Sequence, residues 1–560
     1  MLNPLLLSLI SLLPFVHGLL EVKLGKTTVS GRAVSDKVDF FGGIPFAEPP
    51  LGPLRLRKPI LRTRLATPLF NASTYGKSCI QPLADPTTLS EDCLTINVFR
   101  PAGVSSKEKL PVLFWTYGGG FIIGSSNMYD GSNLVARSVA RGTPIVYVNF
   151  NYRLGPLGYP IGQEADDKRA LNLALHDQTT ALEWVHANIH LFGGDKSKVT
   201  IFGESAGAMM TGVQFLNPQL GKLARGAIFE SGQANGPGTF TASRNEPVWQ
   251  RFVGNVASCA SIASSGETFD CLKNATTEEI TASVLASVSF DELPWIPTVD
   301  TGKGSIFPDF ASKLYAKGMF ARLPFIAGNN LDEGTLFAAP QEMTDADFKA
   351  MVVEGHSPPT VSQQALEEVA DKLLELYPDD PTVGSPYGTG DELFGLPRSF
   401  KRSAALMGDM TFVAARRQWN QVAAQFGVKS YGYHFTHPQS PATQLGVTHG
   451  AEIPFVFGQV PPTDSAGQSL SSLVMDYWIS FTVSLTPNDG KGIERPNWPR
   501  YTERDQLVLR LEGGNTTAVK GRFQEGTACF PRQERLYSEA VDSSNCLTRS
   551  PSGLRGSSPI

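Results

Sequence analysis

Apolar and polar positions divide most of the chain into two alternating kinds of segment. Continuous apolar runs, many of them rich in β-branched residues, occupy residues 111–115, 144–150, 199–202, 227–229 and 324–328, with turn-rich or helical stretches between them. Runs without polar alternation are typical of strands that are covered on both faces, as in a mostly parallel sheet. The pattern therefore predicts a parallel central sheet flanked by helices.

The first 60 residues follow a different pattern, in which polarity alternates and turn residues are frequent, as in TTVSGRAVSDKVDFFGG. This alternation predicts antiparallel strands ahead of the parallel core. Helices are predicted at 173–189 and at 362–377, where the apolar residues of the second share one face and follow a Thr360-x-x-Gln363 capping-box pattern. Together these elements predict an α/β fold: a large, mostly parallel central sheet with a small antiparallel N-terminal portion.

The two ends of the chain differ from the part between them. Residues 1–18 contain an apolar run that ends in modest residues near Gly18, which predicts a secretory signal peptide. That run is shorter than the roughly 20 apolar residues that a membrane-spanning helix needs, so stable membrane insertion is not expected. Residues 547–560 are rich in Ser, Pro and Gly and are predicted to form a mobile tail. With no internal repeat or long linker, residues 19–546 are predicted to form a single domain.

Charge and cysteine usage narrow the class of protein. A formal net charge of -5 without a long Lys/Arg run argues against a nucleic-acid partner. An even number of cysteines after a signal-like start indicates an oxidising compartment, and the absence of a CxxC pair argues against a zinc site. Proximity along the chain favours the disulfides Cys79–Cys93, Cys259–Cys271 and Cys529–Cys546.

Three Asn-X-Ser/Thr sequons, at Asn71, Asn274 and Asn515, are candidate glycosylation sites. Glycan acceptors of this kind belong to proteins of the secretory route. The sequence therefore predicts a protein that is secreted or resides in the lumen of the secretory pathway.

The first candidate catalytic segment is the pentapeptide Gly203-Glu204-Ser205-Ala206-Gly207, which follows an apolar run and precedes a helical segment. A serine in a G-x-S-x-G turn between a strand and a helix is exposed for attack on a carbonyl. An ordinary glycine-rich turn is the structural alternative. A second run, WTYGGGFIIG at 115–124, can aim backbone N–H groups at an oxyanion. Nucleotide binding is disfavoured, because neither a Walker lysine nor a GxGxxG helix start accompanies these glycines.

Longer segments carry a family resemblance. They are GIPFAEPPLGPLRL, SEDCLTINVF, YGGGF, NYRLGPLGY, DQTTALEWVHANIHLFGGDKSKVTIFGESAGA, GNNLDEGTLF and THGAEIPFVFG, in this order. In these motifs the chain resembles the type-B carboxylesterases, the α/β-hydrolase family of cholinesterases and fungal lipases. The resemblance implies the α/β-hydrolase fold over nearly the whole mature chain.

The resemblance also implies roles for individual residues. It makes Ser205 the nucleophile, Glu333 the acid and His449 the base, and it makes the N–H groups of Gly119, Gly120 and Ala206 the oxyanion hole. No metal or organic cofactor is implied. The family pattern favours Glu333 over Asp332, which the residues alone leave open.

Other charged residues in the matched segments receive structural interpretations. Arg55 with Glu91 and Arg153 with Asp177 resemble the family's structural ion pairs. Two interpretations of Glu204 remain open, a carboxylate that tunes the field near His449 or a turn cap. A metalloprotease is disfavoured because the segment HANIH, at 186–190, lacks the glutamate of HExxH.

The loop between Cys79 and Cys93 bears on the substrate. Where the family's lipases carry a long amphipathic lid and its cholinesterases a choline-stacking tryptophan, this loop is short and contains no tryptophan. The favoured function is therefore a serine carboxylic ester hydrolase that acts through an acyl-enzyme on soluble or moderately apolar small-molecule esters. The alternatives are an acyl-transfer or lactone-opening enzyme of a biosynthetic pathway and, more remotely, a non-catalytic cholinesterase-like adhesion protein.

Overall fold

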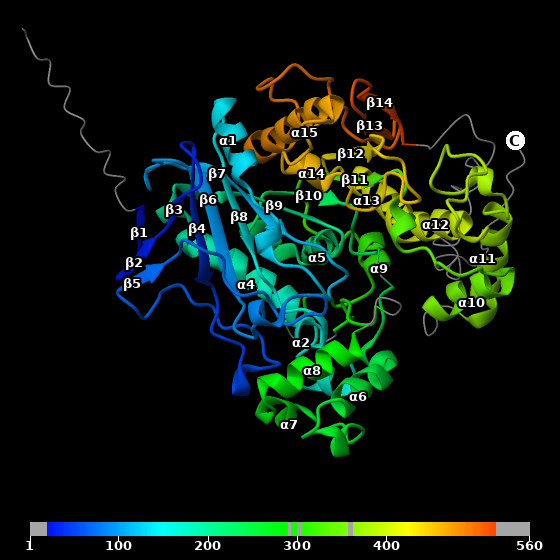
Figure 1. The fold of residues 1–560 in the computed structure, drawn as a ribbon, viewed down its shortest axis with the longest axis horizontal. Coiled ribbons are helices and arrows are strands. Elements are labelled where there is room, and N and C mark those ends of the chain that lie inside the picture. The colour runs from blue at the N-terminus through cyan, green and yellow to red at the C-terminus, as the bar shows by residue number, and fades with distance from the viewer. Residues whose placement is uncertain are drawn as a thin grey trace, which may run out of the picture.

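The computed structural model describes residues 20–521 except 237, 289–292, 301, 303 and 357–361. A twisted sheet crosses the molecule, with helices on both of its faces (Figure 1). Helices α1 (Ser132–Ala140) and α15 (Ser465–Ser484) pack together on one side, while α4 (Leu173–Asn188) and α5 (Ala206–Phe215) lie on the other (Figure 1). The segments predicted for the signal peptide, the Cys529–Cys546 pair and the tail lie outside the described residues, as does Thr360.

Within the described residues, eleven strands form the main sheet in the order β14-β13-β12-β11-β10-β9-β7-β8-β6-β4-β3. The strands from β8 to β13 along this order are parallel to one another, and antiparallel strands complete both edges. The strands of this sheet are β3 Arg32–Ala33, β4 Val38–Pro45, β6 Thr95–Pro101, β7 Leu110–Thr116, β8 Val146–Phe150, β9 Gly194–Glu204, β10 Gly226–Glu230, β11 Phe325–Asn330, β12 Ser430–Phe435, β13 Leu507–Leu511 and β14 Thr517–Lys520. Every apolar run used to predict a strand falls within or overlaps one of them.

The N-terminal portion is less purely antiparallel than its polarity pattern predicts. Strands β1 (Glu21–Leu24) and β2 (Thr27–Ser30) are antiparallel, but β5 (Leu69–Asn71) pairs with β2 in parallel and completes a small three-stranded sheet. Strand β5 contains only three residues and follows a long connection, so no alternation of polarity marks it. The antiparallel strands β3 and β4 extend the main sheet instead.

Two helical lobes lie at the margins of the sheet (Figure 1). One contains α6, α7 and α8, and the other contains α10, α11 and α12 with a small apolar core of its own. The remaining helices have the bounds α2 Gly155–Gly158, α3 Gln163–Asp167, α6 Glu246–Gly254, α7 Phe269–Asn274, α8 Thr277–Ser287, α9 Ala311–Ala316, α10 Asp345–His356, α11 Gln363–Leu376, α12 Phe400–Gly408, α13 Ala414–Gln425 and α14 Ile453–Val456. At α11 the N-cap is Ser362, whose hydroxyl accepts from the Ala365 N–H, so the Thr360 capping-box prediction is wrong.

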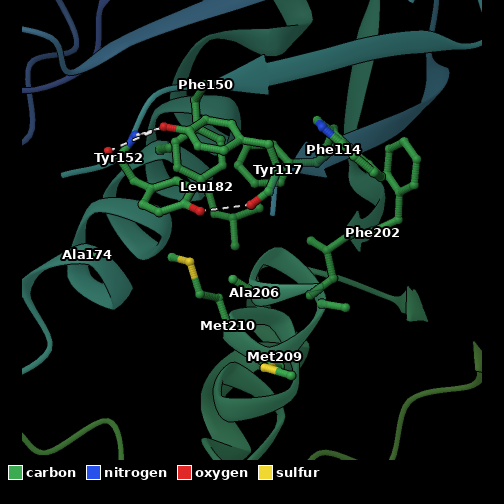
Figure 2. Packing of buried hydrophobic residues seen from close by; sticks show 14 of the residues in the cluster. Phe114, Tyr117, Phe150, Tyr152, Ala174, Leu182, Phe202, Ala206, Met209 and Met210 are labelled. Carbon is green, nitrogen blue, oxygen red and sulfur yellow. Dashed lines mark hydrogen bonds between the residues drawn. The ribbon is translucent and has the colours of Figure 1, made fainter. Parts of the chain in front are cut away.

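The principal core packs against the strand-to-helix turn that contains Ser205. Figure 2 shows Tyr117 and Tyr152 beside the first turns of α5, with Met209 and Met210 below them. The two tyrosine rings stack with their centroids 4.4 Å apart, and the Tyr152 hydroxyl donates to the Tyr117 carbonyl at 2.8 Å. Because these groups are buried and hydrogen-bonded, they provide a rigid base for the turn.

Covalent and ionic links hold the outer segments. The structure contains the disulfides Cys79–Cys93 and Cys259–Cys271, as chain proximity predicts. The Arg55–Glu91 and Arg153–Asp177 pairs are buried and bidentate, so the structural interpretation of these four residues is confirmed. The three sequon asparagines are exposed, and their glycosylation stays a prediction.

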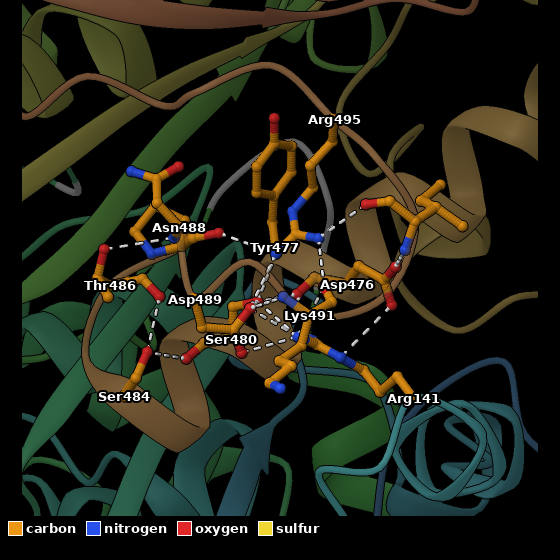
Figure 3. Close-up of polar contacts among 12 residues, drawn as sticks. Arg141, Asp476, Tyr477, Ser480, Ser484, Thr486, Asn488, Asp489, Lys491 and Arg495 are labelled. Carbon is orange, nitrogen blue, oxygen red and sulfur yellow. Dashed lines mark hydrogen bonds and ion pairs between the residues drawn. The ribbon is translucent and has the colours of Figure 1, made fainter.

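A cluster of arginines and aspartates joins α1, α15 and the loop that follows α15 (Figure 3). Asp476, whose side chain is fully buried, accepts two hydrogen bonds from Arg137 and one from the Ile493 N–H. Arg141 and Arg495 both donate to Asp489. Charge-assisted pairs of this kind fix the two helices and the loop relative to one another.

Candidate active site

Ser205 occupies a strained turn between β9 and α5. Its backbone has φ 54° and ψ −129°, in a region that non-glycine residues rarely adopt. A hydrogen bond of 2.8 Å from the Ser205 N–H to the Glu230 carbonyl holds the turn. A Cβ atom at Gly203 or Gly207 would lie within 2.5 Å of the Thr116 carbonyl oxygen. The two glycines therefore allow β7 to approach the turn closely, as the elbow interpretation predicts.

The glycine run after β7 lies directly beside the elbow. A Cβ atom at Gly118 would lie 2.7 Å from the Ser205 Cβ, and Gly119 has φ +105°. Among the described residues, the backbone N–H groups of Gly119, Gly120 and Ala206 have no acceptor. These free donors are suitable for an oxyanion.

His449 lies in the loop after β12, and its imidazole contacts carboxylates on both sides. Its Nδ1 lies 2.6 Å from Glu333 Oε2, and its Nε2 lies 3.1 Å from Glu204 Oε1. The Nε2 atom has no hydrogen-bond partner in the part of the chain that the structure describes. This arrangement leaves Nε2 available to accept a proton, close to Glu204, which directly precedes Ser205 in the chain.

The structure distinguishes the two adjacent acids. Asp332 points away from the imidazole: its carboxylate accepts from Ser385 Oγ at 2.8 Å and from the N–H groups of Tyr387 and Val447 at 2.9 Å. It thereby fixes the loop that carries His449, whereas Glu333 contacts the ring itself.

Three hydrogen-bond donors surround Glu333, and two of them, Asn329 and Asn330, belong to the same GNNLDEGTLF segment. Its Oε1 accepts from Ser231 Oγ at 2.6 Å, from the Asn330 N–H at 2.7 Å and from Asn329 Nδ2 at 3.3 Å. Ser231 follows β10 and is fully buried. Its hydroxyl therefore supports the carboxylate. The pairing of β10 with β11 brings Ser231 to Glu333, whereas Asn329 and Asn330 are near neighbours of Glu333 in the chain.

The electrostatics of the site are set by crowded carboxylates. Burial by itself lowers the pKa of His449, but Glu204 and Glu333 outweigh it and raise that pKa to about 9. Burial raises the pKa of Glu204, and the neighbouring Glu452 adds to the increase. Glu204 Oε1 lies 3.1 Å from His449 Nε2, and among the described residues the Glu204 carboxylate makes no turn-capping hydrogen bond. The geometry favours the field-tuning interpretation of Glu204.

Two phenylalanines enclose the imidazole on its apolar sides. The ring centroid of Phe412 lies 4.4 Å and that of Phe337 5.1 Å from the centroid of His449. Phe412 belongs to a π-helical turn, Asp409–Val413, between α12 and α13, and Phe337 is partly exposed. No helix in the described part of the chain combines the length and apolar character needed to span a membrane. Nor do three or more His, Cys, Asp or Glu side chains in the described ranges form a group that could hold a metal ion.

Comparisons with known proteins agree with this architecture. The model of the carboxylesterase family matches residues 19–529. Lipase 2 of Geotrichum candidum is 34% identical over 92% of this chain and 95% of its own length. Secreted lipase 1 of Botryotinia fuckeliana is 36% identical, with 86% and 87% covered, and a secreted triacylglycerol lipase of Gibberella zeae is 34% identical, with 91% of each covered.

Solved structures show the same fold. The esterase EstA of Aspergillus niger superposes with a TM-score of 0.80 at 28% identity, covering 94% of this chain and 99% of its own. A structure titled PNB esterase gives a TM-score of 0.72 at 27% identity, with 92% and 99% covered. The fold is therefore that of the α/β-hydrolase esterases, as predicted. The chain belongs to the carboxylesterase family and is a carboxylic ester hydrolase.

Proposed function

We propose that the chain is a secreted serine esterase that works through an acyl-enzyme. Ser205 Oγ attacks the ester carbonyl, and its proton passes to His449 Nε2. The N–H groups of Gly119, Gly120 and Ala206 bind the oxyanion. The imidazolium then protonates the leaving alkoxide, and water releases the acid by the same route in reverse.

One observation carries this proposal: His449 Nδ1 lies 2.6 Å from Glu333 Oε2 while its Nε2 faces the elbow that presents Ser205. The serine, the acid and the base follow β9, β11 and β12, whose carboxyl ends meet at one edge of the sheet. Glu333 thereby fixes the imidazole tautomer that leaves Nε2 free to accept a proton. The apolar start, the two disulfides and the relatives named as secreted support export.

The loop between the first two cysteines supports soluble or moderately apolar esters as substrates. The Gln81 side chain accepts from the Gly124 N–H at 2.7 Å and donates to the Gly124 carbonyl at 2.9 Å, so the loop is anchored beside the glycine run. Leu83 is its one strongly exposed large apolar side chain among the described residues. A short, anchored loop with so little apolar surface is poorly suited to open onto a lipid surface.

The test is a panel of p-nitrophenyl esters of increasing acyl length, together with tributyrin below and above its solubility limit. We expect turnover of dissolved short and medium esters without a jump when droplets form. The Ser205→Ala variant should lower kcat on the order of a million-fold. Full turnover by that variant would refute the mechanism, and a steep rise at the solubility limit would refute the substrate class.

A further inference from the structure

Arg416, on α13, is buried in a way that distinguishes it from the other buried arginines. Arg416 is only 1% exposed. Four other buried arginines each lie within 4 Å of a carboxylate, namely Arg55, Arg100, Arg153 and Arg402. Within the described ranges Arg416 has no such carboxylate, and its Nη1 has no hydrogen-bond partner. A buried guanidinium is costly unless negative charge compensates it.

The compensation lies one amide away, at the candidate active site. Arg416 Nε donates to Asn329 Oδ1 at 3.0 Å, and Asn329 Nδ2 donates to Glu333 Oε1 at 3.3 Å. Glu333 Oε2 in turn contacts His449 Nδ1 at 2.6 Å. The guanidinium thus orients the Asn329 amide so that its N–H faces the carboxylate, and it polarises that amide toward the negative charge.

Glu333 lies in a group of buried carboxyls. Its neighbours include the buried carboxyls of Glu204 on β9, Glu230 on β10 and Glu452 beside α14. Burial raises the pKa of all three, and repulsion between the carboxylates adds to it. On β12 the Tyr433 hydroxyl and His434 also lie in this region, and Tyr501 lies near Arg416. Arg416 is the buried cation hydrogen-bonded toward Glu333 in this group.

We propose that Arg416 is a positioning residue which, through Asn329, directs the Glu333 carboxylate at His449 and adds positive charge to the site. The inference rests on the proposed function, because it assigns Arg416 to the same acid and base. If Arg416 had a structural role alone, its replacement would lower stability without changing the pH dependence of catalysis.

The test compares the pH dependence of kcat/KM for p-nitrophenyl butyrate in the full-length wild type, Arg416→Met and Arg416→Lys. Removing a buried positive charge makes His449 bind a proton more readily. The acid limb of the profile should therefore move to higher pH by about one pH unit in Arg416→Met, and kcat should fall. Arg416→Lys retains the charge, so its acid limb should stay near that of the wild type even though the hydrogen bond to Asn329 is altered.

Arg100→Met is the matched control, because Arg100 is a buried arginine paired with Asp39 on the edge strand β4. We expect it to lower the melting temperature without moving the acid limb. If Arg416→Met does not fold, Asn329→Asp replaces it: a negative charge between the guanidinium and Glu333 should likewise move the acid limb to higher pH.

The outcomes separate this inference from the function on which it rests. An acid limb that stays in place in the folded charge variant, with a loss of stability like that of Arg100→Met, overturns the role of Arg416 alone. A limb that moves equally in Arg416→Lys also overturns it. Full activity in Ser205→Ala would overturn the proposed function and this inference together.

Discussion

The cluster between α1 and α15 contains three arginines and two aspartates, whereas the cluster around His449 contains four glutamates, one imidazole and, one amide away, a single arginine. In the first cluster every charged side chain has an oppositely charged partner within 4 Å (Figure 3). In the second, like charges lie close together, and the His449 Nε2 and one Glu204 oxygen have no hydrogen-bond partner among the described residues. Removing one partner of a buried ion pair is costly to stability, whereas crowded buried carboxylates change the proton affinity of the groups beside them.

The largest expected loss of activity is at Glu333, in the cluster around His449. We expect Glu333→Gln to lower kcat about 10⁴-fold, because a neutral amide holds the imidazole in the wrong tautomer and cannot stabilise the imidazolium. Steady-state kinetics on p-nitrophenyl butyrate measure this. Asp332→Asn is the matched control, since Asp332 supports the loop rather than the ring. An equal loss of kcat in both variants would contradict the assignment of the acid.

In the cluster between α1 and α15, a substitution is expected to lower the stability of the protein. Asp476→Asn should destabilise the protein by roughly 3–5 kcal/mol, because it leaves Arg137 without its counter-charge and removes one of the two carboxylates beside Arg141. Urea unfolding followed by tryptophan fluorescence reports the change, and kcat of the folded variant should be close to that of the wild type. Asp379→Asn, which removes an exposed pair with Arg398, should change stability by less than about 1 kcal/mol. Similar urea midpoints for the two variants would show that the buried cluster contributes no more to stability than an exposed ion pair.

The smallest expected effect is at Glu204. Its carboxylate helps to raise the pKa of His449 to about 9, so Glu204→Gln should lower that pKa. His449 acts as a base only when it is deprotonated, and the acid limb of the kcat/KM profile should therefore move to lower pH, opposite to the shift expected for Arg416→Met. An unmoved limb would indicate that Glu204 does not act on the imidazole.

Much of the fold was predictable, because local patterns encode it. Continuous apolar runs correctly identify β7 to β11, and the glycines around Ser205 mark the elbow, since only glycine permits the approach of the Thr116 carbonyl. Strand β5 and the N-cap of α11 were not predictable. The strand is very short, and the cap depends on the direction of one side chain.

The support of the candidate site was mostly not predictable. Ser231 and Arg416 lie far from Glu333 in the chain and belong to no spaced motif, so the contact of Ser231 with Glu333 and that of Arg416 with Asn329 follow only from the tertiary fold. The distinction between Asp332 and Glu333 is likewise invisible to residue chemistry alone. It depends on which side of the strand end each carboxylate faces.

The central claim is that Ser205 forms a covalent acyl-enzyme. Its most direct test is mass spectrometry of the protein quenched in acid during turnover of a slowly deacylating p-nitrophenyl ester, followed by proteolysis and peptide sequencing. We expect one acyl group per chain on the peptide that contains Ser205, and none in Ser205→Ala. Turnover without acylated peptide, or an acyl group on another residue, would contradict it.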